Sequence, residues 1–509
     1  METKKESWRE DLASFLDKNS NLILIAIILF TVIIRLKYLT INQAVWYDEA
    51  EYLSTARYWA FSHPEYQLHF VRPPLLPFIL AIFYKLGASE IFFRITMLLS
   101  STIAVFFTYL IGKELINKKV ALLSTFILSF FYVSLFYTAR IMTDLPSMTI
   151  WLIAVWSFWK GYIKKESRKH VWLFGFLVSV GILMKFPYGL LVIVIILYLL
   201  LTEKFRFLKD KDLWIAAFIG IISMIPYSIW YIKVYNKIPI LGAAEFYESV
   251  SYFKVYIFDI IPMVLQSPFP GVTELFPKFS FLVILFILGF ILVLLDVLIG
   301  YNLAAKNEQI RKYLFILLWI LVPFSYFAFI AGQVPEDRYL FYIYPAMFYL
   351  ISLAAVYLYE KIRRIHKYAG VIAIMVLCLV FFSIFSTQLQ VADNLIKVKS
   401  SSYIQFKNAG NWINENSDAD DQVVAAGVPQ LSYYSERKII YWPSKKEEFE
   451  ELIGNKNIKY IVLSVLEGSP EWSYDWPEEN KNRVTLVQAH FADKEKTRPI
   501  LVVYKFLDR

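Results

Sequence analysis

The stretch that decides the fold is residues 21–59, NLILIAIILFTVIIRLKYLTINQAVWYDEAEYLSTARYW. It begins with an apolar run of about twenty residues, which is the length of a helix that crosses a bilayer. Asp48, Glu49 and Glu51 follow within four residues, among aromatic side chains. Carboxylates beside hydrocarbon are costly to desolvate. These acids are therefore either solvated bystanders at a membrane edge or part of a reactive site.

The composition is that of a polytopic α-helical membrane protein. Of the 509 residues, 58% are hydrophobic and 19% are charged, whereas soluble domains carry about 25% charged residues. Aromatic residues reach 18%, as expected where many helix ends lie at the headgroup level. The single cysteine, Cys378, excludes an intramolecular disulfide and a cysteine-based metal cluster.

Apolar runs of spanning length recur along the chain and predict about eleven transmembrane helices. Residues 74–86, PLLPFILAIFYKL, are too short and too rich in proline to span, and predict a helix at the interface. The predicted spans are roughly 21–40, 90–111, 120–138, 145–160, 171–184, 187–202, 213–233, 279–300, 313–331, 339–359 and 369–388.

The loops alternate in charge, which predicts the orientation. One set is rich in Lys and Arg, for example KGYIKKESRKH and EKIRRIHK, while the other set is poor in them. Basic loops stay on the cytoplasmic side, so segment 1–20 is predicted to be cytoplasmic and the C-terminus to lie outside. The net charge of +9 lies in these loop clusters, which argues against a nucleic-acid partner. This orientation predicts that the following residues lie on the outer face: Asp48, Glu49, Glu51, His63, Arg72, Asp144, Lys185, Asp337 and Arg338.

Three domains follow from these patterns. Residues 1–20 are predicted to be a cytoplasmic segment, 21–388 a transmembrane domain whose first outer loop (41–89) is structured and which carries the candidate catalytic residues, and 389–509 a small extracytoplasmic α/β domain. The last assignment rests on short β-rich runs that alternate with helical patterns near 402–415 and 444–454. These runs are VVAAG, KIIYW, KYIVLSV, VTLVQ and ILVVYKF.

Each charged residue of the predicted outer face could have a structural role instead of a catalytic or binding role. Asp48 and Glu49 begin an amphipathic helix in a long loop, and Glu51 is expected at its surface. Arg72 precedes two prolines and is either a snorkelling arginine or a clamp for a lipid phosphate. Asp144 either caps the fourth span or serves catalysis.

Further candidates come from the remaining outer loops. Lys185 lies at a hairpin tip, and Arg338 opens the tenth span, so both suit an anionic headgroup. Tyrosines near these loops are either an aromatic belt or contacts to substrate. His63 and His69 do not have a diagnostic metal-ligand spacing. The candidate contacts to donor or acceptor are Tyr47, His63, Tyr339 and Tyr344.

In their order along the chain, WYDEAEYLSTARYW, VRPPLLPFILAIFYKLG, TARIMTDLPSMTIWLIAVW, GILMKFPYGLL and DRYLFYIYPA resemble the GT-C glycosyltransferases. The resemblance is to the protein O-mannosyltransferase and lipid A aminoarabinose transferase branch, over roughly residues 20–390. It implies a GT-C fold and a sugar donor on a polyprenyl phosphate, of dolichyl or undecaprenyl type, used outside the membrane.

The resemblance also implies roles for single residues. Asp48 acts at the acceptor with Glu49 beside it, and Asp144 matches a second acid near the start of the fourth span. Arg72, Lys185 and Arg338 match positions near the lipid phosphate. Some relatives carry an acid, associated with a metal, where this chain has Val71, so no cofactor is predicted and a divalent metal is not supported.

The residues themselves fit an inverting sugar transfer. A phosphate leaving group needs no general acid if cations stabilise its charge, and a carboxylate such as Asp48 suits the base at the acceptor. The acceptor, whether protein, lipid or glycan, is not specified by the sequence. The alternative is a transporter or flippase of lipid-linked sugars, for which broken helices, repeated halves and charges near span midpoints are typical.

Overall fold

The computed structural model describes residues 18–41, 43–238, 250–266, 280–300, 307–332, 334–366, 368–455, 457–493 and 495–507. The chain forms two compact units, each described here by itself. Unit 1 comprises Met1–Leu39, Phe70–Pro73 and Arg94–Leu395, and unit 2 comprises Thr40–His69, Pro74–Phe93 and Ile396–Arg509. Most of the predicted cytoplasmic segment, residues 1–17, lies outside the described residues.

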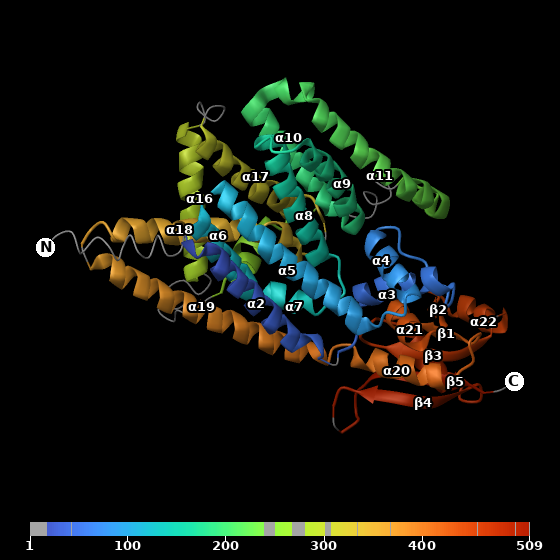
Figure 1. Cartoon of the computed structure of the whole chain (residues 1–509). Coiled ribbons are helices and arrows are strands. Elements are labelled where there is room, and N and C mark those ends of the chain that lie inside the picture. The colour runs from blue at the N-terminus through green and yellow to red at the C-terminus, as the bar shows by residue number, and fades with distance from the viewer. Residues whose placement is uncertain are drawn as a thin grey trace. The chain divides into compact units, whose positions relative to one another are not determined.

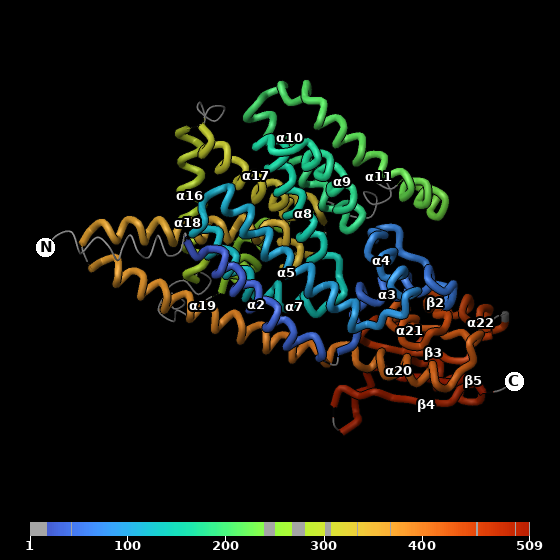
Figure 2. The backbone as a smooth tube through the Cα atoms, in the orientation of Figure 1, coloured from blue at the N-terminus to red at the C-terminus, as the bar shows by residue number. Residues whose placement is uncertain are grey.

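Unit 1 is helical (Figure 1; Figure 2 traces its backbone). Short π-helical or 3₁₀ segments lie at Trp159–Ile163 (η1), Phe186–Gly189 (η2), Lys204–Lys209 (η3), Tyr256–Ile260 (η4) and Asp337–Tyr342 (η6). The first four residues of α5 and the last five of α19 belong to unit 2. The α-helices are α2 (Ser20–Leu39), α5 (Glu90–Leu115), α6 (Lys118–Phe130), α7 (Tyr132–Thr138), α8 (Asp144–Phe158), α9 (Arg168–Met184), α10 (Leu190–Glu203), α11 (Lys211–Tyr235), α13 (Phe253–Val255), α14 (Ile261–Val264), α16 (Phe281–Gly300), α17 (Glu308–Phe329), α18 (Tyr344–Ile362) and α19 (Ala369–Ser400).

The predicted count of eleven spans is not confirmed. Within the described part of the chain, seven helices are long and apolar enough to cross a membrane, and an eighth span results if α6 and α7, bent by 52°, are one. Three more helices, α8, α9 and α18, lie where spans were predicted. With 17 residues, α9 is shorter than the roughly 20 residues that a span needs. α8 continues directly into η1, but Asp144 and Lys160 make this segment less apolar. Glu360 and Lys361, together with several tyrosines, make α18 less apolar.

Two buried polar side chains supply hydrogen bonds at the break between α6 and α7. Phe131 is extended there, which leaves helix-end backbone groups without their usual partners. The Arg35 guanidinium, 1% exposed, donates to the Ser129 carbonyl at 2.8 Å. Gln388 accepts from the Tyr132 amide at 3.0 Å. These bonds satisfy backbone groups of the broken helix within the protein interior.

Unit 2 contains a five-stranded mixed sheet of order β2-β1-β3-β5-β4. β1 is parallel to β2 and β3, while β5 is antiparallel to β3 and β4. All five predicted strands are confirmed, as are the helices near 402–415 and 444–454. The elements are α3 (Tyr47–Phe61), α4 (Leu75–Lys85), α20 (Ile404–Glu415), β1 (Gln422–Ala425), α21 (Val428–Ser435), β2 (Lys438–Tyr441), α22 (Lys446–Asn455), β3 (Ile458–Ser464), α23 (Glu471–Glu479), β4 (Val484–Phe491) and β5 (Pro499–Phe506).

The first loop packs into the same unit as the C-terminal sheet. Ser54 of α3 donates to the Pro429 carbonyl at 3.0 Å, and Arg57 donates to the Tyr433 carbonyl at 2.6 Å. Tyr66 is buried in the core that β1, β3 and β5 form with α20 and α21. The loop is therefore structured, as predicted, but its folding partner is the C-terminal part of the chain.

Candidate functional site

The predicted site residues divide between the two units. Arg72, Asp144, Lys185, Arg338, Tyr339 and Tyr344 lie in unit 1, and Tyr47, Asp48, Glu49 and His63 lie in unit 2.

Asp144 and Lys185 form a buried ion pair in unit 1. Asp144 is the first residue of α8 and is 2% exposed, and Lys185 follows the last residue of α9, with its side chain 14% exposed. The Lys185 ammonium donates to the Asp144 carboxylate. The positive end of α8 also favours a carboxylate at this position. The capping position itself is held by Thr143, so the capping role considered for Asp144 is not observed.

Arg338 lies near the same Tyr339 ring as Lys185. The Lys185 ammonium is 5.3 Å and the Arg338 guanidinium carbon 5.6 Å from the ring centroid, both within range of a cation–π interaction. Arg338 makes a two-pronged contact to Glu336, with Nε to Oε2 at 2.7 Å and Nη2 to Oε1 at 2.9 Å. We call Asp144, Lys185, Glu336, Arg338 and Tyr339 the ion-pair cluster.

Aromatic packing holds the cluster in place. The Tyr339 ring stacks on Phe327 with 5.5 Å between centroids and 7° between planes. Near Asp144, Ser147 shares a hydrogen bond of 3.0 Å with the Tyr342 hydroxyl, and Tyr342 packs against Trp151 at 4.8 Å. The charges of the cluster therefore lie against largely buried aromatic rings, where electrostatic interactions are stronger than in water.

Asp337 adjoins the cluster; the loop charges assigned it to the predicted outer face, but it was not among the predicted site residues. Burial raises the pKa of its carboxyl to about 6, and the Tyr137 hydroxyl, which donates to it at 3.2 Å, opposes that shift. The Tyr344 hydroxyl donates to the Asp337 carbonyl at 2.6 Å, and Tyr344 is buried. Tyr344 thus uses its hydroxyl within the protein, while Tyr339 lies inside the cluster.

Arg72 lies in a bend between Phe70 and α4 and is partly exposed. Phe70 packs near Tyr235 at 6.5 Å, and the Lys237 ammonium is 5.2 Å from the Phe70 ring centroid. The segment 70–73 is thereby placed beside the end of α11 within unit 1.

The three carboxylates of the first loop have different surroundings in unit 2. Glu49 is fully buried and accepts a hydrogen bond of 2.9 Å from the Trp46 amide, which fixes the start of α3. Glu51 is also buried and accepts from the His69 amide at 3.0 Å, so the expectation of a surface residue was wrong. Asp48, in the first turn of α3, is partly exposed.

The C-terminal part of unit 2 adds residues near Asp48 that the sequence did not reveal. Burial raises the pKa of Glu467, in the turn after β3, and the charge of Asp48 adds to this rise. The Tyr47 hydroxyl lies 3.2 Å from the Tyr441 hydroxyl. Glu467 is an isolated acid in the stretch VLEGSP, and no spacing pattern marked it.

A metal site finds no support in the residues at hand. Within the described ranges, no three His, Cys, Asp or Glu side chains are grouped so that they could hold an ion. His63 is exposed beyond the end of α3. The residues do not fit a bound divalent cation, so no step is derived through one.

A multi-pass helical unit together with a small mixed-sheet unit gives this chain the GT-C fold. The solved structure of ArnT from Cupriavidus metallidurans bound to undecaprenyl phosphate is similar, with a TM-score of 0.62, 12% identity, and coverage of 94% of this chain and 97% of that chain. Archaeal oligosaccharyltransferase AglB from Archaeoglobus fulgidus, in complex with an inhibitory peptide and a dolichol-phosphate, matches with a TM-score of 0.55, 11% identity, and coverage of 96% and 74%.

Sequence comparison gives a local match. Residues 71–230 match the profile of the family described as dolichyl-phosphate-mannose-protein mannosyltransferase. That range contains Arg72, Asp144 and Lys185. A search among curated protein sequences gave no match.

Proposed function

We propose that this membrane protein transfers a sugar from a polyprenyl-phosphate donor to an acceptor, with inversion at the anomeric carbon. The observation that carries the proposal is the ion-pair cluster, in which Lys185 and Arg338 both lie within cation–π distance of the Tyr339 ring. The GT-C fold and the family match over 71–230 support it. The ligands named for ArnT and AglB, undecaprenyl phosphate and dolichol-phosphate, indicate the donor class.

Three cationic side chains are suited to stabilise the polyprenyl phosphate that leaves in this reaction. When the bond between the sugar and the phosphate breaks, its electron pair stays on the phosphate oxygen. Lys185, Arg338 and Arg72 are proposed to bind that phosphate, and fixed cations at a developing charge lower the barrier. Carboxylate partners hold two of these cations in position: Asp144 pairs with Lys185, and Glu336 with Arg338.

The acceptor needs a base. Asp48 is proposed to take the proton from the acceptor hydroxyl or amine as the new bond to the sugar forms, because it is partly exposed at the start of a well-anchored helix. Glu49 is proposed to position Asp48, since its carboxylate is bound to the Trp46 amide. Tyr47 and His63 remain proposed contacts to substrate.

The loop charges support an orientation with the N-terminus in the cytoplasm. Under this proposal the reaction occurs on the extracytoplasmic face, and unit 2 lies there as well. Protein, lipid and glycan acceptors all remain within the proposal.

The test uses the full chain purified in detergent, with undecaprenyl- and dolichyl-phosphate sugars as donors. Release of the polyprenyl phosphate and the mass of the acceptor product are measured. Asp48→Asn should abolish transfer while the thermal unfolding midpoint stays unchanged. The matched control is Asp393→Asn, which changes a carboxylate paired with Lys37 at 2.9 Å, away from the cluster. Full transfer by Asp48→Asn would remove Asp48 as the base.

A second candidate function is transport of a lipid-linked sugar. It is favoured by the bent pair α6 and α7 and the buried Arg35 beside it, since broken helices and internal charges are typical of transporters. Movement of the donor across vesicles without a new glycosidic bond would support transport.

A further inference from the structure

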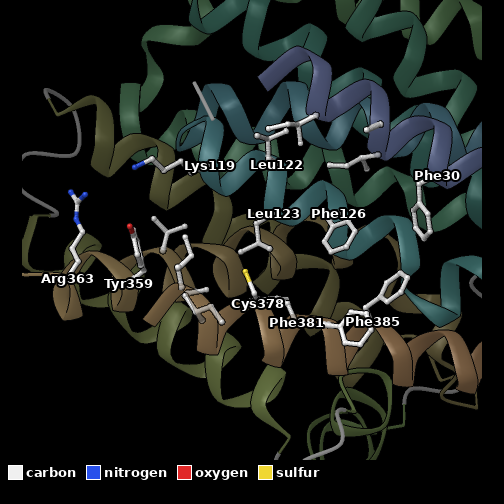
Figure 3. Close-up of a pocket in the computed structure, with 18 residues that line it drawn as sticks. Phe30, Lys119, Leu122, Leu123, Phe126, Tyr359, Arg363, Cys378, Phe381 and Phe385 are labelled. Carbon is white, nitrogen blue, oxygen red and sulfur yellow. The ribbon is translucent and has the colours of Figure 1, made fainter. Parts of the chain in front are cut away.

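An apolar groove of about 770 Å³ opens between α2, α6, α18 and α19 of unit 1. Figure 3 shows Lys119, Tyr359 and Arg363 at one end, and Phe30 and Phe385 toward the other. Its volume is within the roughly 300–1,000 Å³ of ligand sites. The lining is apolar apart from the end with Lys119 and Arg363.

The charged end has more cations than anions. Lys119 pairs with Glu360 at 3.2 Å, and Arg363 pairs with the same carboxylate. Two cations therefore share one anion at the mouth of the groove, which leaves a net positive charge for an anionic headgroup. Basic pockets between membrane helices are known to hold such headgroups, and the planar guanidinium suits a phosphate.

The other end is closed by aromatic rings. Phe385 of α19 contacts Phe30 of α2 at 5.7 Å, Phe126 of α6 at 6.1 Å and Phe130 of α6 at 5.3 Å. Beyond this contact, Lys37 and Asp393 join α2 to α19 again. A chain that enters at the charged end therefore meets a barrier.

The length of the groove matches one leaflet. Its lining on α19 runs from Ile374 to Phe385, which is about 16 Å of helix. Half of the hydrocarbon thickness of a bilayer is about 15 Å. A polyprenyl chain is much longer than this groove, whereas one acyl chain of a phospholipid is close to its length.

We propose that this groove binds one anionic phospholipid, with its acyl chain along α19 and its phosphate at Lys119 and Arg363. This site is separate from the proposed sugar transfer, because its residues do not belong to the ion-pair cluster. Its occupant would fill the gap between α19 and its neighbours α2 and α6.

The test is native mass spectrometry of the full chain in detergent, titrated with phosphatidylglycerol or with phosphatidylcholine. Wild type should bind one phosphatidylglycerol in preference to phosphatidylcholine. A basic residue near an anionic headgroup contributes about fivefold in affinity. K119A and R363A should therefore each lower the affinity for phosphatidylglycerol by about that factor, and should lower the affinity for phosphatidylcholine less, because its choline offsets the phosphate charge. The matched control is K160A/R311A, which removes two cations paired with other carboxylates.

Alkylation of the only cysteine in the sequence tests the same proposal on the wild-type protein, without any substitution. Cys378 lines the groove and is exposed, so alkylation with a bulky maleimide should remove the bound phosphatidylglycerol. This arm stays decisive even if K119A or R363A fails to fold. Equal binding of the two phospholipids, or no effect of alkylation, would overturn the proposal. Displacement of phosphatidylglycerol by undecaprenyl phosphate at this site would also overturn it, because the groove would then belong to the sugar carrier.

Discussion

The buried pair of Asp144 and Lys185 gives a prediction with a definite magnitude. Lys185→Met removes the ammonium and leaves the Asp144 carboxylate, 2% exposed, without its cation. Removing one partner of a buried ion pair costs about 3–5 kcal/mol, because the remaining charge is no longer compensated. Asp144→Asn should cost a similar free energy for the same reason.

The double variant separates stability from activity. Replacing both partners by neutral side chains of similar volume is often neutral or stabilising, so D144N/K185M should regain most of the stability lost in either single variant. Its transfer activity should stay low, since the proposed phosphate-binding cation is gone. Thermal unfolding in detergent and release of polyprenyl phosphate measure the two quantities on the same preparations.

A control pair defines the result that would refute this reasoning. Lys160 forms a partly buried ion pair with Glu114 at 2.8 Å, but Glu114 keeps a second cation, Lys164, at 2.6 Å. Lys160→Met should therefore cost only about 1 kcal/mol. If Lys185→Met is no more destabilising than Lys160→Met, or if the double variant is as unstable as the single variants, the buried pair is not the source of the effect.

Two further predictions concern carboxylates with other roles. Burial raises the pKa of Asp337 from 3.8 to about 6, so the folded state holds its proton more tightly and the free energy of unfolding should fall by up to about 3 kcal/mol as the pH rises from about 4 to 6. Asp337→Asn should remove this slope in unfolding measured across the same pH window, and an unchanged slope would contradict it. Glu49→Ala should lower the stability by about 1 kcal/mol through loss of its bond to the Trp46 amide, whereas Glu49→Gln should keep both stability and transfer. Loss of transfer in a stable Glu49→Gln would instead indicate that the Glu49 charge takes part in the reaction.

Local patterns were sufficient to predict the strands, and they predicted α19 only in part. The β-rich runs of the C-terminal region are apolar, bounded by turn residues, and fold as five strands. The change of composition near residue 389 indicated the end of a helix, yet α19 continues to Ser400. Gln388, Ala392 and Ile396 are buried at a spacing of four, so one stripe of the helix stays packed while its other faces become polar.

The contacts of the candidate site depend on long-range packing, which no spacing reveals. Asp144 and Lys185 are 41 residues apart and meet because the start of α8 lies beside the end of α9. Glu51 is buried because the amide of His69, 18 residues later, binds it. Sequence patterns could place such residues near one membrane face, but they could not identify their partners.

Unit 2 is discontinuous in the sequence, so its first part is synthesised well before the part on which it packs. Thr40–His69 and Pro74–Phe93 share one unit with the residues from Ile396 onward, so about 300 residues are synthesised between the two parts of this unit. At roughly 5–20 residues per second, the first part waits about 15–60 s for its partner. During that interval Ala50, Leu53 and Ala56 of α3, buried in the finished protein, lack the α21 surface on which α3 packs. The nascent loop therefore has a long exposure to chaperones and proteases, and a chain truncated before Ile396 would keep it exposed.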